Sequence, residues 1–243
     1  MNAVRSIVFN FFFFTGSLAL SILLLWALLL PKNTCAKIVS EVYGGYVSFI
    51  EKYIMGITLE VKGLSNIPKD GAFILASKHQ SAFETFKLPY MRKLGYPAVI
   101  FKKELSYIPI WGWYPARMGG VAIDRGAGAK AMRSLIKGCK ASIENGRPIV
   151  IFPQGTRTKV GAKAPYKPGI AKIYKDLNVP VIPVALNSGL FWGKSAFLKK
   201  SGKVTFEILP AIKPGKPPLK MMEELETAIE TASDRLAKKR VIK

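Results

Sequence analysis

The pattern of apolar and polar positions divides the chain into an uncharged N-terminal stretch and a longer region of short alternating elements. Residues 7–30 contain no charged side chain. As a helix, this stretch would be about 36 Å long, enough to cross a bilayer core of about 30 Å. A cleaved signal peptide is the alternative, but its apolar part would be shorter and followed by a cleavage site with small residues. The pattern therefore favours a retained membrane segment, which either spans the bilayer or enters one leaflet.

Residues 34–55 form a second candidate helix. Its apolar residues recur at near-helical spacing, among them Ile38, Val42, Phe49 and Tyr53. The aromatic residues suit a membrane interface, although a helix packed against a protein core would show the same spacing. We expect residues 1–57 to form an N-terminal pair of membrane-associated helices.

Beyond residue 57, short apolar runs alternate with amphipathic segments. Strands are expected at residues 58–62, 72–77, 97–101, 120–123, 149–152, 180–186 and 203–209. Helices are expected at residues 82–94, 105–118, 129–144, 169–177 and 219–239. Strands that alternate with helices predict an α/β domain over residues 58–243, with a mostly parallel mixed sheet flanked by helices.

The net charge of the chain indicates what kind of molecule it binds. The chain carries 37 Lys and Arg residues against 15 Asp and Glu, a net charge of +22, and 49% of its residues are hydrophobic. Such a balance indicates an anionic partner, which can be nucleic acid, an anionic lipid surface or an acidic carrier protein. The two cysteines, Cys35 and Cys139, match no metal-binding spacing and are expected to be free thiols in a reducing compartment.

His79, the only histidine of the chain, directly follows the predicted strand at residues 72–77 and Lys78. Ligands of α/β sheets bind beyond the carboxyl ends of the strands. Imidazole is also the one side chain whose ordinary pKa suits a general base near neutral pH. Any catalysis by an imidazole base must therefore use His79.

Glu84, five residues after His79, has two readings. If His79 lies in a loop and Glu84 in the first turn of the next helix, the carboxylate can hold one ring nitrogen and leave the other free to accept a proton. Alternatively, Ser81 and Glu84 form a capping box, with Ser81 as the N-cap. The two roles are compatible.

Three further predicted strands end in loops that carry cations. The cations are Lys102 or Lys103, then Arg125, then Arg157. Arginine can bind a phosphate with two parallel hydrogen bonds. In the third loop, Gly155 allows close approach of the backbone and Thr156 offers a hydroxyl. One such loop would be an ordinary solvated turn, but three beside the His79 strand end predict an anion site next to a base.

Four ordered blocks carry a specific resemblance. They are His79-Gln80-Ser81…Glu84, Gly120…Ile123-Asp124-Arg125, Phe152-Pro153-Gln154-Gly155-Thr156-Arg157 and Val179-Pro180-Val181-Ile182-Pro183-Val184-Ala185. In this order, and over about residues 60–210, they resemble the glycerolipid acyltransferase family, and most closely its bacterial 1-acylglycerol-3-phosphate acyltransferases. The chain departs from the family pattern twice, with Glu84 where Asp is usual and Gln154 where Glu is usual.

The resemblance implies transfer of a fatty acyl group from acyl carrier protein or coenzyme A to the sn-2 hydroxyl of 1-acylglycerol-3-phosphate, giving phosphatidic acid. His79 would deprotonate the hydroxyl and Glu84 would orient His79. Backbone N–H groups near Gly155, or at the helix start after Gln80, would stabilise the oxyanion. No metal or cofactor is implied. The phosphate of the lysophospholipid acceptor would be bound by Lys102, Arg125, Gly155, Thr156 and Arg157.

This function would place the protein on the cell inner membrane, with its catalytic domain on the cytoplasmic face and against anionic headgroups. Trp111, Trp113 and Tyr114 would line an acyl groove, lie at the interface or pack in the core. The alternatives are another lyso-lipid acceptor, a hydrolase or transacylase, and a non-enzymatic membrane-tethered protein that binds anionic lipid or nucleic acid. The favoured function involves no nucleic acid.

Overall fold

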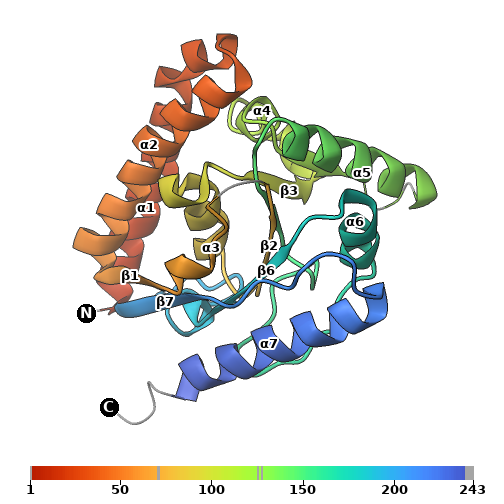
Figure 1. The fold of residues 1–243 in the computed structure, drawn as a ribbon. Helices are drawn as coiled ribbons and strands as arrows, with labels where there is room; N and C mark the ends of the chain where they lie inside the picture. The colour runs from red at the N-terminus through yellow and green to blue at the C-terminus, as the bar shows by residue number, and fades with distance from the viewer. Residues whose placement is uncertain (1, 70–71, 125, 127, 239–243) are drawn as a thin grey trace.

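The computed structural model describes residues 2–69, 72–124, 126 and 128–238. The chain begins with a helical hairpin of α1 (Asn2–Leu23) and α2 (Lys32–Ile50), which lie side by side at the left of Figure 1. A 3₁₀ turn, Leu25–Leu29, joins them, and a π-helical turn, Glu51–Met55, extends α2. Gly56 ends this turn with a φ of +66°, a conformation that favours glycine.

Seven strands of the described chain form one sheet in the order β1-β7-β6-β2-β5-β3-β4. Their bounds are β1 (Ile57–Lys62), β2 (Ile74–Ser77), β3 (Ala98–Lys102), β4 (Val121–Ile123), β5 (Ile149–Ile151), β6 (Val181–Leu186) and β7 (Gly202–Ile208). Neighbouring strands are parallel except β6 and β7, which run antiparallel. The central strands β2, β5 and β6 are buried at every position, as expected for strands that helices cover on both faces.

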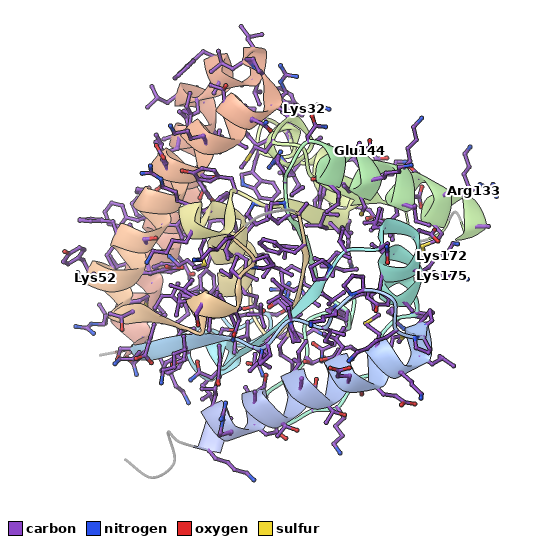
Figure 2. All side chains as sticks on the ribbon, viewed as in Figure 1. Lys32, Lys52, Arg133, Glu144, Lys172 and Lys175 are labelled. Atoms are coloured by element: carbon purple, nitrogen blue, oxygen red, sulfur yellow. The ribbon has the colours of Figure 1, made fainter. Side chains whose placement is uncertain are left out.

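The helices lie on the two faces of this sheet. The hairpin shares one hydrophobic core with the sheet, in which Phe9 and Val39 pack with Leu75 and Phe206. The opposite face is covered by α5 (Gly128–Glu144), α6 (Gly169–Leu177) and α7 (Pro218–Lys238), which lie at the right and bottom of Figure 1. The labelled charged side chains of α2, α5 and α6 point outward from the molecule (Figure 2). The mostly parallel mixed sheet flanked by helices is thereby confirmed, whereas the division at residue 57 stays a prediction.

Two expected helices are much shorter than predicted. Within residues 82–94, only α3 (Phe83–Lys87) is α-helical, and 3₁₀ turns at Leu88–Tyr90 and Arg92–Leu94 follow. Pro89 has no backbone N–H and cannot donate the hydrogen bond that would continue the α-helix, and the chain leaves helical geometry at Met91, whose ψ is +107°. Within residues 105–118, α4 is confined to Trp113–Arg117, because the chain leaves the helical region at Ile110, whose φ is +63°.

Candidate active site

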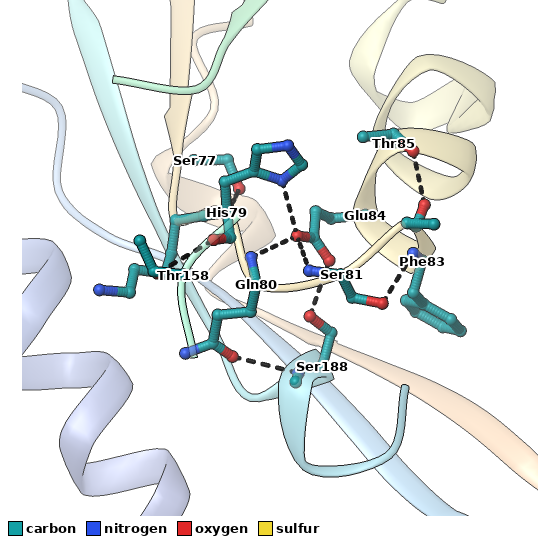
Figure 3. A network of polar contacts seen from close by, with 12 residues as sticks. Ser77, His79, Gln80, Ser81, Phe83, Glu84, Thr85, Thr158 and Ser188 are labelled. Atoms are coloured by element: carbon teal, nitrogen blue, oxygen red, sulfur yellow. Dashed lines mark hydrogen bonds and ion pairs between the residues drawn. The ribbon is translucent and has the colours of Figure 1, made fainter. Parts of the chain in front are cut away.

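His79 lies directly beyond the carboxyl end of β2, as the sequence predicted, with 14% of its side chain exposed. Its ring stacks on Phe152, with 4.2 Å between the ring centroids. Its Nδ1 atom lies 3.0 Å from Oε1 of Glu84. An Nδ1–H donated to this carboxylate leaves the lone pair on Nε2, and Figure 3 shows the second ring nitrogen directed away from Glu84. His79 is thus arranged to accept a proton from a ligand.

Glu84 is fully buried and satisfied by four partners. Besides facing His79, its Oε1 accepts hydrogen bonds of 2.6 Å from the backbone N–H groups of Gln80 and Ser81. Its Oε2 accepts a 2.7 Å hydrogen bond from the hydroxyl of Ser188, which follows β6 (Figure 3). The carboxylate therefore caps the start of α3 and orients His79 at the same time. The cap differs from a standard box, because the Ser81 hydroxyl accepts from the N–H of Phe83.

Gln154 holds the backbone of His79. Its Oε1 accepts a 3.0 Å hydrogen bond from the N–H of His79, and the side chain is almost completely buried. The backbone N–H and the hydroxyl of Thr158 donate to the carbonyl of His79 at 2.8 and 3.1 Å. Nε2 of Gln154 lies 3.4 Å from that Thr158 hydroxyl oxygen and can donate to it. The amide therefore supplies both an acceptor and a donor, whereas a carboxylate at this position would supply acceptors only.

A cavity of about 1020 Å³ extends from His79 toward the hairpin. Trp111 and Tyr114 contribute to its wall, whereas Trp113 is half exposed. The hairpin side is lined by Leu20, Ser21, Leu24, Val39 and Tyr43. The sheet itself provides the opening, because β3 pairs with β5 only up to Val99 and pairs with β4 from Ile100 onward. The carboxyl ends of β3 and β5 thus separate on one side of His79.

The cavity also brings together the described residues that the sequence assigned to an anion site. They are Lys102, Gly155, Thr156 and Arg157. Lys103, the alternative to Lys102, instead pairs with Asp124 on the surface at 3.2 Å. Arg125 lies outside the described residues. The left-handed φ of +68° at Gly155 lets the loop turn back toward the cavity.

Sequence reasoning missed several contributors to the site. Lys167 and Lys194 also line the cavity, and neither follows a strand in a recognisable motif. Ser188 lies 104 residues from Glu84 in the sequence, so no local pattern could have paired them. The one local feature that marks Lys167 in the sequence is its position next to Pro168, just before α6 begins.

Three backbone N–H groups in the regions expected to supply oxyanion donors already have partners. The N–H groups of Gln80 and Ser81 donate to Glu84, and the N–H of Gly155 donates to the carbonyl of Phe152 at 2.8 Å. These three groups are therefore not oxyanion donors in this arrangement, and a donor elsewhere near Gly155 or at the helix start after Gln80 stays a prediction. The site as built offers a base, its orienting carboxylate, an apolar cavity and cations. This set can deprotonate a hydroxyl on an anionic, partly apolar ligand.

Comparisons with known proteins show which family the chain belongs to. The acyltransferase family model matches residues 58–187. The 1-acyl-sn-glycerol-3-phosphate acyltransferase of Pseudomonas aeruginosa is 32% identical over 218 residues, covering 87% of this chain and 82% of that protein. The protein of the same name from Helicobacter pylori is 34% identical over 134 residues, covering 55% and 54%. The crystal structure of the 1-acyl-sn-glycerophosphate acyltransferase PlsC from Thermotoga maritima matches with a TM-score of 0.75 over 97% of both chains, at 23% identity. The chain belongs to the acyltransferase family.

Proposed function

We propose that this acyltransferase moves a fatty acyl group from an acyl thioester to the sn-2 hydroxyl of 1-acylglycerol-3-phosphate, which yields phosphatidic acid. The observation that carries the proposal is the His79–Glu84 pair, 3.0 Å apart, whose imidazole lines a largely apolar cavity together with Lys102 and Arg157. The names of the relatives support the choice of substrates.

The reaction begins with proton transfer from the acceptor hydroxyl to Nε2 of His79. The oxygen attacks the thioester carbonyl carbon, and a C–O bond forms as the carbonyl becomes an oxyanion. Collapse of this intermediate breaks the C–S bond, and the thiolate leaves with the proton returned by the imidazolium. Glu84 holds Nδ1–H throughout and stabilises the imidazolium, a role that carboxylates play toward catalytic histidines in other enzymes.

The acceptor's phosphate is proposed to bind Lys102 and Arg157, with the backbone at Gly155 and the hydroxyl of Thr156 completing the site. Arg125 belongs to the same proposal on sequence grounds alone. Support comes from the cations of the cavity wall, because an apolar cavity strengthens their attraction for phosphate. The acyl chain would occupy the apolar part of the cavity. Either acyl carrier protein or coenzyme A can present the thioester, and the basic chain is compatible with both.

The protein is further proposed to bind the inner membrane from its cytoplasmic side, with α1 embedded in one leaflet. Among the described residues, α1 is the helix long and apolar enough to cross a bilayer. Yet one face of α1 is committed to the protein, since Phe9 is buried and Ser6 bonds to the backbone of Lys199. The opposite face exposes Val4, Ile7, Phe11, Phe14, Leu18 and Ile22. An apolar face along one side of a docked helix suits insertion parallel to the surface.

Acyl-transfer assays test the proposal directly. Detergent-purified protein is given acyl-carrier-protein and coenzyme A thioesters, with lysophosphatidic acid or other lyso-lipids as acceptors, and His79→Ala is measured in parallel. Transfer to lysophosphatidic acid that disappears in the variant is the expected result. Transfer only to another lyso-lipid would contradict the proposed acceptor. Release of free fatty acid alone would indicate a hydrolase. No turnover by a folded protein would contradict the proposal as a whole.

A further inference from the structure

Lys78, the residue before His79, is a buried cation that the proposed reaction does not use. Only 3% of its side chain is exposed, and its Nζ lies 2.7 and 2.5 Å from the two carboxylate oxygens of Glu230 on α7. Lysine is almost never fully buried unless it is paired. The side chain is not among those that line the cavity, so any effect of Lys78 on a bound substrate is indirect.

Glu230 also connects Lys78 to the loop of the anion site. Its Oε1 accepts a 2.9 Å hydrogen bond from the hydroxyl of Tyr166. Tyr166 lies nine residues after Arg157, in the segment that leads from the Gly155–Thr156 loop into α6. One carboxylate of α7 therefore joins the histidine loop to the segment that follows the anion loop.

The backbone around His79 is held from the other sides as well. The N–H of Lys78 donates to the carbonyl of Val184 on β6 at 3.0 Å. The N–H of His79 donates to Gln154, and its carbonyl accepts from Thr158. Among the described residues, the Lys78–Glu230 pair is the side-chain contact that ties this segment to α7. This anchor holds the end of the Lys78 side chain against α7, one residue before His79.

We propose that Lys78 and Glu230 are positioning residues, through which α7 fixes the His79 loop relative to the anion loop. The proposal rests on the proposed acyl transfer for its kinetic consequence. Stability alone does not account for the pair, because replacing a buried ion pair by uncharged groups is often neutral or even stabilising. The position of the pair, one residue before the proposed base, points to a geometric role.

A double variant distinguishes an effect of the ion pair on the position of His79 from an effect on the stability of the fold. Glu230→Gln alone leaves an uncompensated buried ammonium, which is strongly destabilising. Adding Lys78→Met removes that charge, so Lys78→Met/Glu230→Gln should recover most of the melting temperature. Arg235→Met is the control for loss of an ion pair on the same helix. Arg235 lies five residues after Glu230 on α7, and its more exposed side chain pairs with Glu207 of β7.

Steady-state transfer assays give the kinetic result. We expect kcat of the double variant to stay about tenfold below the wild-type value, with both KM values within about twofold, while the control variant keeps wild-type kcat. Lys78→Arg, which preserves the ion pair, should retain more activity than Lys78→Met. A double variant that regains kcat together with its melting temperature would overturn the proposal, as would an equal loss in the control.

NMR of the single histidine tests the geometry without turnover. Protein labelled on histidine and purified without a histidine tag gives the imidazole signals of His79 alone, because the chain has one histidine. We expect these signals to shift or broaden in the double variant and to be unchanged in Arg235→Met. Unchanged signals in the folded double variant would overturn the positioning role, whether or not the enzyme transfers acyl groups to the proposed acceptor.

Discussion

Among individual residues, Glu84 shows how a helix cap and an orienting carboxylate can be the same group. The backbone N–H groups of Gln80 and Ser81 approach the same Oε1 atom that faces His79. A carboxylate that accepts several hydrogen bonds is held in one orientation, so the imidazole that binds it is held as well. The other carboxylate oxygen, Oε2, accepts a hydrogen bond from the hydroxyl of Ser188.

The variant Glu84→Gln removes the negative charge of this side chain and keeps its size. The amide oxygen can still accept from the N–H groups of Gln80 and Ser81, and the amide nitrogen can donate to Ser188. The variant should therefore fold, but it can no longer stabilise the imidazolium by charge. We expect kcat to fall by about 10²-fold or more, the range typical of general-base catalysis. Near-normal turnover would leave Glu84 as a helix cap only, and Ser188→Ala is the milder control.

Replacing Gln154 should have a smaller effect on kcat than replacing Glu84. Gln154→Ala removes the acceptor for the buried N–H of His79, which should cost about 1–3 kcal/mol of unfolding free energy and lower kcat about tenfold. Gln154→Glu keeps that acceptor, and the Thr158 hydroxyl can turn to bond it, so this variant should retain at least about a third of the activity. Urea unfolding and steady-state kinetics measure both. An inactive Gln154→Glu would show that the amide itself contacts the substrate.

The sequence predicted the parts of the site that are close together in the chain or follow strands. His79 and Glu84 could be paired because five residues and a strand-to-helix change separate them. Lys102 could not be chosen over Lys103 until the structure paired Lys103 with Asp124. Glu230 and Ser188 meet the histidine loop only through the tertiary fold, and no periodic pattern carries such long-range information.

Among the elements, a very short helix holds the carboxylate that faces His79. Helix α3 spans five residues, too few to be stable alone. The predicted helix at residues 82–94 is α-helical only to Lys87, because Pro89 lacks the backbone N–H that the next α-helical hydrogen bond requires. What holds α3 in place is tertiary: Lys87 bonds to Ser48 of α2 at 2.7 Å and pairs with the buried Glu51 of the π-helical turn. The hairpin therefore supports the helix that carries Glu84.

The Glu51–Lys87 pair predicts a pH-dependent stability. Burial outweighs the attraction of Lys87 and raises the pKa of Glu51 from 4.5 to about 7, and Oε1 of Glu51 lacks a hydrogen-bond partner among the described residues. Between these pH values, the folded state keeps a proton that the unfolded chain has released. The stabilisation is thus complete below about pH 4.5 and is lost as the pH rises to about 7.

Glu51→Gln mimics the neutral form and isolates this contribution. The unfolding free energy of the wild type minus that of the variant should fall with rising pH, by up to about 3 kcal/mol between about pH 4.5 and pH 8, at 1.36 kcal/mol per pKa unit. Urea unfolding at several pH values measures the difference. Glu41→Gln, an exposed change on α2, should show no such trend. A flat difference for Glu51→Gln would contradict the assignment.

In the whole molecule, the hairpin is both a wall of the cavity and the proposed membrane contact. Leu20 and Leu24 of the hairpin line the same cavity as His79, while the opposite face of α1 exposes Phe11 and Phe14. A lipid acceptor held in one leaflet would then lie beside the site. The sequence could identify the apolar stretch but not its orientation, because a 24-residue uncharged run fits a spanning helix and a half-buried one equally well.

Cysteine labelling distinguishes the two orientations. The native Cys35 and Cys139 are buried and can be replaced by alanine. Single cysteines are then introduced as Asn2→Cys and Asn33→Cys, at exposed positions beyond the two ends of the apolar stretch. The protein is added to preformed anionic vesicles, and a membrane-impermeant thiol reagent is applied from outside. A helix that lies in one leaflet keeps both positions on the outer side, so both cysteines should react at comparable rates.

A spanning helix would give a different result, because one of the two cysteines would react only after the vesicles are dissolved in detergent. Lys220→Cys, on the exposed surface of α7, should react in every case and reports the amount of bound protein. The one-leaflet arrangement is expected because the buried face of α1 is bound to the domain by Phe9, Ser6 and Lys199. Crossing the bilayer would carry those attached segments, with the Lys199 ammonium, into the hydrocarbon, at a cost of several kcal/mol for each unpaired polar group. Protection of Asn33→Cys would therefore require the hairpin to separate from the sheet, and His79 would lose one wall of its cavity.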